Sequence, residues 1–137
     1  MNQYVLDACA LLAVLNKEDG AELVRDTIDQ AKAGSALILM SVINLLEVYY
    51  GVLRECGEEI AEKIIQSVNA SPIKVVDILS NEVFKEAGRL KAAYRISLAD
   101  SIALAEASVS GASLLTSDHH EFDAVEESEN IIFHWIR

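Results

Sequence analysis

The chain has 137 residues, of which 52% are hydrophobic, so it is long enough for one domain with a buried core and too apolar for a disordered protein. Its formal net charge of −11 argues against a non-specific nucleic-acid coat protein, which needs a basic face. No apolar run reaches the roughly 18 residues that span a membrane. We therefore expect a single domain over residues 1–137 with no membrane association.

The N-terminal segment contains a short apolar stretch, YVLDACALLAVL (4–15). No basic region precedes it and Asp7 interrupts it, so we do not expect a secretory signal. The two cysteines, Cys9 and Cys56, do not make a disulfide framework and are ordinary in a reducing compartment. These features predict a cytoplasmic protein.

Five short β-like runs alternate with helical segments along the chain. The predicted strands are residues 3–8, 36–41, 73–78, 112–117 and 130–136, and the predicted helices are residues 9–16, 20–33, 43–56, 57–69, 80–94 and 98–110. This alternation predicts an α/β fold with a central, mostly parallel sheet of four or five strands covered on both faces. Ligands of such sheets bind beyond the carboxyl ends of the strands, so polar residues there are candidate site residues.

Four acidic residues stand at or near these strand ends. Asp7 closes the first predicted strand, Asp118 follows the fourth, and Glu47 lies in the helical stretch SVINLLEVYYGV (41–52) after the second. Asp100 falls in the first turn of the helix that leads to the fourth strand, and no lysine or arginine follows it until Arg137. Three of the four, Asp7, Glu47 and Asp100, thus lie on apolar segments without a cation nearby in sequence.

Each acid except Glu47 also has a purely structural explanation. Asp7 can cap the helix that follows it, Asp100 stands three residues after Ser97 as in a capping box, and Asp118 can close an Asx turn. Taken together, however, buried carboxylates without partners cost several kcal/mol or become protonated. A divalent cation bound by oxygen ligands removes that cost, and Mg²⁺ or Mn²⁺ is the usual ion of an all-carboxylate site.

Other chemistries have weaker support in the sequence. No Cys/His set has zinc-ligand spacing, and we expect His119 and His120 to be a solvated loop pair and His134 a strand residue. Glycine-rich phosphate loops and the G-x-S-x-G nucleophile elbow are absent. A phosphoacceptor receiver domain would need a second acid beside Asp7 and a lysine after a late strand, and a haloacid-dehalogenase-type phosphatase would need an Asp-x-Asp start. Metal-assisted phosphodiester hydrolysis fits best.

Four stretches resemble, in order and spacing, the acidic motifs of PIN domains, and most closely those of VapC-type toxins of toxin–antitoxin pairs. They are YVLDACALLAVL, SVINLLEVYYGV, ISLADSIALAEAS and LLTSDHHEF. The resemblance covers essentially the whole chain. It implies a PIN-like α/β/α sandwich and a Mg²⁺- or Mn²⁺-dependent endoribonuclease, with Asp7, Glu47, Asp100 and Asp118 as the catalytic, metal-binding acids.

The resemblance also implies supporting residues and partners. Thr116 matches a hydroxyl residue that supports the site, and Asn44, on the same helix face as Glu47, could orient that carboxylate or a water. VapC-like proteins form homodimers and are neutralised by a small antitoxin protein. Cys9 departs from the family, which commonly has a hydroxyl or amide residue there, and a thiol is a poor hydrogen-bond donor.

A basic segment precedes the third acidic motif, and it contains Lys85, Arg89, Lys91 and Arg95. These side chains could contact the RNA backbone, or they could form a solvated helix face with pairs to neighbouring glutamates. The acidic charge and Cys9 leave a second functional class open. In that alternative, the chain is a PIN-fold interaction protein that binds RNA or a protein partner without cleaving.

Overall fold

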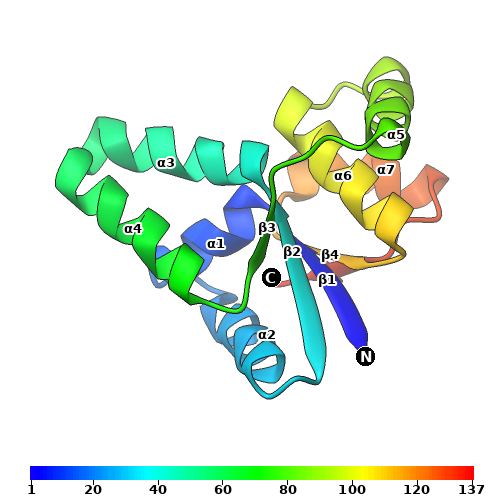
Figure 1. The fold of residues 1–137 in the computed structure, drawn as a ribbon. Helices are drawn as coiled ribbons and strands as arrows, with labels where there is room; N and C mark the ends of the chain where they lie inside the picture. The colour runs from blue at the N-terminus through cyan, green and yellow to red at the C-terminus, as the bar shows by residue number, and fades with distance from the viewer.

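The computed structural model describes all residues 1–137, which form five strands and seven helices (Figure 1). The strands are β1 (Asn2–Leu6), β2 (Ala36–Ser41), β3 (Lys74–Val76), β4 (Ser113–Thr116) and β5 (Phe133–Trp135). The helices are α1 (Ala8–Leu15), α2 (Ala21–Lys32), α3 (Val42–Cys56), α4 (Glu58–Ala70), α5 (Asn81–Ala93), α6 (Leu98–Ser110) and α7 (His119–Ser128). None of these helices combines the length and the apolar character needed to cross a membrane.

The strands form one sheet in the order β3-β2-β1-β4-β5, and every neighbouring pair is parallel. Helices α1 to α4 cover one face and α5 to α7 cover the other (Figure 1). The predicted α/β/α sandwich around a parallel sheet is therefore confirmed. This architecture follows from the apolar composition of the strands. Strands that are apolar on both faces are stable only in a sheet that is covered on both sides.

Alternation along the central strands divides the core into two halves. Val5 and Leu114 pack with α5, α6 and α7, whereas their neighbours Leu6 and Leu115 pack with the helices on the opposite face. Successive side chains of a strand point to opposite faces, so both halves receive fully buried residues from the same two strands. This arrangement fixes β1 and β4 at the centre of the protein.

The sheet has one topological switch point, which lies between β1 and β4. From β1 the chain adds β2 and then β3 on one side, and it returns across the sheet to add β4 and β5 on the other. In parallel sheets, ligands bind at the carboxyl ends of the strands where the strand order reverses. The residues that follow β1 and β4 are Asp7 and the segment 117–118.

Two local predictions differ from the structure. The histidines His119 and His120 do not belong to a loop: they begin helix α7, which Asp118 caps by accepting a hydrogen bond from the Glu121 N–H at 3.2 Å. The third and fifth strands are shorter than predicted, because β3 pairs with β2 only at Lys74–Val76 and β5 pairs with β4 only at Phe133–Trp135. His134 lies in β5, as expected.

Candidate functional site

Asp7 lies at the first position after β1 and caps helix α1. Its Oδ1 accepts a hydrogen bond from the Ala10 N–H at 2.9 Å, so the structural explanation of Asp7 is correct as far as it goes. The side chain is only 1% exposed, and its second oxygen, Oδ2, has no hydrogen-bond partner. A cap needs one carboxylate oxygen, and the buried second oxygen remains to be accounted for.

Burial raises the pKa of Asp7 to about 7, and the nearby Asp118 and Glu47 charges add to this rise. The Thr116 hydroxyl and the Ala10 N–H lower it in part, although no hydrogen bond of good geometry joins Thr116 to Oδ2. A nearby positive charge would lower the pKa of this carboxyl, so the raised value indicates that Asp7 has no such partner. Asp7 is therefore placed where a cation would be strongly favoured.

Thr116 and Asp118 form the neighbouring wall of the site. Thr116, the last residue of β4, is fully buried, and its Oγ1 accepts a hydrogen bond from the Asp118 N–H at 3.1 Å. This bond bends the chain after β4 so that Asp118 stands beside Asp7, whose pKa it raises. Thr116 thus shapes the turn after β4 that carries Asp118.

Glu47 reaches the site from helix α3, which starts directly after β2. Ser41 caps this helix by accepting a hydrogen bond from the Ile43 N–H at 3.2 Å. Burial raises the pKa of Glu47, the Asn44 side chain lowers it, and the Asp118 charge raises it further. Glu47 thus lies near Asp118 although 71 positions separate them in the sequence.

Asp100 lies in the first turn of helix α6, where the Ser97 hydroxyl caps the helix by accepting a hydrogen bond from the Asp100 N–H at 3.1 Å. The cap uses the backbone N–H of Asp100, and its carboxylate has no lysine or arginine partner. Burial raises the pKa of this carboxyl to about 7, Ser97 lowers it, and the charges of Asp118, Asp7 and Glu47 raise it. Asp100 therefore serves the helix start and the acidic cluster together.

The structure brings the four predicted acids into one cluster, which we call the acidic site: Asp7, Glu47, Asp100 and Asp118. Their charges act on one another, and none has a lysine or arginine partner. No three acidic, histidine or cysteine side chains lie close enough to ligate one ion at once. Because Mg²⁺ in proteins is commonly bound through one or two carboxylates and several waters, this donor set still fits such an ion.

Cys9 lies at the edge of the acidic site. Burial and the charges of all four acids raise the pKa of its thiol to about 12, with Asp7 contributing the largest of the four charge effects. The thiol is therefore neutral at physiological pH and is neither a nucleophile nor a metal ligand. The thiol lies close to the four acids but is a weak hydrogen-bond donor. A hydroxyl or amide at this position would form stronger hydrogen bonds.

The basic segment is exposed, but one of its members is already paired. Arg89 bonds Glu86 and Glu129, each at 2.7 Å, and so joins helix α5 to the end of α7. Lys85, Lys91 and Arg95 have no acidic partner within ion-pair distance. The i,i+3 pair of Glu86 and Arg89 matches the interpretation as a solvated helix face. The other three cations have no acidic partner and are free to contact a ligand.

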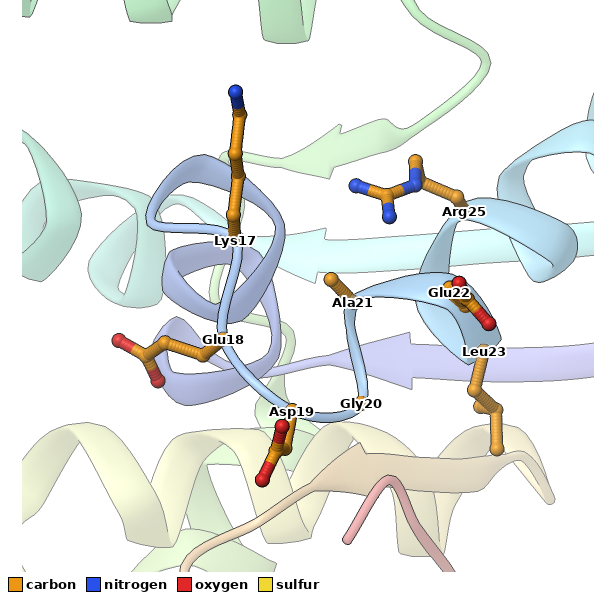
Figure 2. Close-up of a pocket in the computed structure, with 8 residues that line it drawn as sticks. All are labelled: Lys17, Glu18, Asp19, Gly20, Ala21, Glu22, Leu23 and Arg25. Carbon is orange, nitrogen blue, oxygen red and sulfur yellow. The ribbon is translucent and has the colours of Figure 1, made fainter.

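A large hollow on the protein is lined by other residues than those of the acidic site (Figure 2). It is a polar cavity of about 680 Å³ around the turn between α1 and α2, lined by residues 17–23 and Arg25. Gly20 is required at this turn because its φ of +94° favours glycine and because a Cβ would lie 2.6 Å from the Ile136 carbonyl oxygen. None of the four predicted acids lines it, so size alone does not locate the candidate site.

Two buried polar features, one at the acidic site and one outside it, were not foreseen from the sequence. The Ala99 carbonyl oxygen accepts a hydrogen bond from Asn44 Nδ2 at 3.2 Å, which a contact between residues 55 positions apart does not reveal in advance. Glu106 is also buried on α6, and burial raises its pKa, but it faces a different hollow near β3. An acid in the apolar run IALAEAS was the available signal for Glu106.

A three-layer α/β/α domain with acidic side chains gathered at the switch point of a parallel sheet is the arrangement expected of a PIN-type domain. The family model of the PIN domain matches residues 4–128, nearly the whole chain. The protein belongs to the PIN domain family.

Solved structures of VapC-type proteins share this fold. The chain is similar to VapBC2 from Rickettsia felis, solved with a DNA fragment from its promoter, with 21% identity, coverage of 97% of this chain and 98% of that chain, and a TM-score of 0.78. DNA-bound VapBC from Salmonella typhimurium is 17% identical, with coverage of 100% of both chains and a TM-score of 0.77. VapC20 from Mycobacterium tuberculosis, described as a sarcin–ricin loop cleaving toxin, is 16% identical, with coverage of 88% of this chain and 94% of that chain and a TM-score of 0.64. No curated protein sequence matches the chain.

Proposed function

We propose that this protein is a divalent-metal-dependent endoribonuclease and the toxin of a VapBC-type toxin–antitoxin pair. The observation that carries the proposal is the acidic site, in which burial and mutual repulsion raise the pKa of Asp7 and of Asp100 to about 7 without any cation to offset them. Carboxylates in this condition bind a hard divalent cation, which removes both the desolvation cost and the repulsion.

The four acids would divide the work at such a site. The unpartnered Oδ2 of Asp7 and one further carboxylate, of Glu47 or Asp100, would ligate Mg²⁺ or Mn²⁺ directly, and the remaining acids, Asp118 among them, would accept hydrogen bonds from waters bound to the ion. The ion, when bound, lowers the pKa of water and stabilises negative charge on a phosphoryl group during in-line displacement. Thr116 keeps Asp118 in place through its bond to the Asp118 N–H.

The solved structures with a similar fold support RNA as the substrate and an antitoxin as the partner. One of them is described as a toxin that cleaves the sarcin–ricin loop, and others are VapBC complexes. The formal charge of −11 favours a basic antitoxin, because opposite charges speed and orient association. Such a pair would act in the cytoplasm, where the free thiols Cys9 and Cys56 are ordinary.

The homodimer expected of VapC-like proteins has a suitable surface beside β3. Ile78, Leu79, Phe84 and Leu98 are 76, 51, 59 and 64% exposed, which is unusual for large apolar side chains near one another. They border two adjoining hollows of about 260 and 350 Å³ that share Leu79, Leu98 and Ile102. We call this surface the β3–α5 patch.

The charges of the β3–α5 patch favour a second copy of the chain as its occupant. One hollow carries Lys91, and the other carries Asp77 and the buried Glu106. A twofold interface brings the same patch of both subunits together. The patch must therefore contain both charges of any ion pair that forms across the interface. Lys91 of each copy could then pair with an acid of the other while the apolar residues between them are buried.

The alternative is a PIN-fold interaction protein without nuclease activity. It is favoured by Cys9 and by the separation of the acids, since no three of them can ligate one ion as they stand. Thermal unfolding with and without Mn²⁺ separates the two functions, because an ion that binds only the folded state raises its stability. A nuclease site gains stability with Mn²⁺ and loses that gain in Asp100→Asn, whereas an interaction protein gains none in either form.

A further inference from the structure

Only two buried side-chain polar atoms in the protein lack a hydrogen-bond partner, and both belong to residues of the candidate site. They are Oδ2 of Asp7 and Oδ1 of Asn44. Asn44 is completely buried, so solvent does not satisfy this oxygen from outside. A buried acceptor without a donor costs about 1 to 3 kcal/mol, and such groups in native proteins are usually explained by an ordered water or an ion.

The orientation of the Asn44 amide is determined by its other half. Nδ2 donates a hydrogen bond to the Ala99 carbonyl oxygen at 3.2 Å. A carbonyl oxygen can only accept, so a flipped amide would place two acceptors against each other. Oδ1 is therefore the half of the amide that faces away from Ala99 and is free to accept.

The bond to Ala99 joins the two helices that carry the acids. Asn44 lies one turn before Glu47 on α3, and Ala99 directly precedes Asp100 on α6. A single buried amide thus connects the backbone beside Asp100 with the turn of α3 that carries Glu47.

We propose that Asn44 is a positioning residue for the divalent-cation site. Nδ2 sets the distance between α3 and α6, and with it the separation of Glu47 and Asp100, while Oδ1 accepts a hydrogen bond from a water held in the acidic site. This inference rests on the proposed metal dependence and deepens it. Residues that orient metal ligands in this way commonly change metal affinity about 10- to 100-fold when they are removed.

The test is the affinity for Mn²⁺ alone, measured by titration calorimetry at neutral pH without RNA. Asn44→Leu keeps the branched shape and the number of side-chain heavy atoms and removes both polar atoms, and Asn44→Ser keeps a polar group too short to reach Ala99. Thr27→Val is the matched control, because Thr27 is equally buried and donates to the Leu23 carbonyl oxygen within α2, away from the acids. Unfolding of each variant in EDTA measures the purely structural cost.

We expect both Asn44 variants to bind Mn²⁺ about tenfold more weakly or worse, and Thr27→Val to bind it like the wild type while losing comparable stability. If Asn44→Leu does not fold, Asn44→Ser gives the result. A folded Asn44 variant with wild-type Mn²⁺ affinity overturns the positioning role and leaves the proposed nuclease intact. A wild-type protein that binds no Mn²⁺ overturns the metal site itself, and the role of Asn44 with it.

Discussion

The backbone N–H of Asp7 donates a hydrogen bond to the Leu115 carbonyl oxygen at 3.4 Å. This bond continues the pairing of β1 with β4 one residue beyond β1, at the switch point of the sheet. It places the Asp7 backbone next to Thr116, and the bond from the Ala10 N–H to Oδ1 holds the buried side chain. The most central pair of strands thus places a carboxylate at a buried position.

The stability of the metal-free protein should depend on pH through Asp7 and Asp100. Their pKa values are about 7 in the folded protein against an ordinary 3.8, so the folded state binds more protons between these values. Stability is therefore highest near pH 4 and falls as the pH rises to about 7. Glu86 and Glu129, whose pKa values are lowered, act in the opposite direction only below about pH 4.5.

Asp7→Asn isolates this effect, because the comparison with the wild type cancels other titrating groups such as His119. In EDTA at pH 8 the variant should be more stable than the wild type by roughly 1 to 3 kcal/mol, and near pH 4 the difference should vanish. Chemical unfolding across this pH range measures it. Parallel pH profiles for the two proteins would show that Asp7 does not carry an uncompensated charge.

Cys9→Ser should strengthen the site. The Cys9 thiol is neutral and donates weakly, whereas a serine hydroxyl can donate to a neighbouring carboxylate or water. We expect Mn²⁺ to bind about two- to tenfold more tightly, in line with one added hydrogen bond of about 1 kcal/mol. Cys56→Ser, at an exposed position, is the control and should leave the affinity unchanged. Weaker binding in Cys9→Ser would mean that the thiol packs better than a hydroxyl there.

Ile78→Asp should disrupt the homodimer. It places a charge on the β3–α5 patch at a position that is 76% exposed in the single chain, so the fold should tolerate it. Ile132→Asp is the matched control, because Ile132 is 62% exposed and lies just before β5, outside the patch. Light scattering during size-exclusion chromatography should give a dimer for the wild type and the control and a monomer for Ile78→Asp. A dimeric Ile78→Asp would place the interface elsewhere.

We expect Arg89 of the basic segment to contribute to stability and Arg95 to contact RNA. Arg89→Ala should reduce stability by about 1 kcal/mol or less, since its pairs with Glu86 and Glu129 are partly exposed. Arg95→Ala should leave stability unchanged and lower the salt dependence of RNA binding in EDTA by a slope of about 0.7, the value for one phosphate contact with a single strand. The reverse pattern would assign the RNA contact to Arg89.

Most of the fold could be predicted because its signals are local. The apolar run at 36–41 and the charged, periodic segment at 20–33 match β2 and α2 within one residue at either end. Helix α7 was missed, although Asp118 and Glu121 have capping-box spacing and Phe122 and Val125 recur at a helical interval. The adjacent histidines suggested a loop, and the apolar contacts of α7 become visible only once β5 packs beside it.

The candidate site could be predicted in its residues but not in its geometry. Asp7, Glu47, Asp100 and Asp118 stand out in sequence as acids without local cations, and the structure brings them together at the switch point. The pairing of Arg89 with Glu129 and of Asn44 with Ala99 depends on tertiary contacts 40 and 55 residues apart. No spacing rule along the chain contains such contacts, since they are decided by how α3, α5, α6 and α7 pack on the sheet.

The most direct test of the central claim is RNA cleavage by the purified protein with Mn²⁺ or Mg²⁺. We predict that the wild type cleaves internal phosphodiester bonds, that EDTA abolishes cleavage, and that Asp100→Asn is slower by a factor on the order of 10² or more. Asp29→Asn, an exposed acid on α2, should cleave like the wild type. Cleavage by Asp100→Asn at the wild-type rate would contradict the assignment of the acidic site as the catalytic centre.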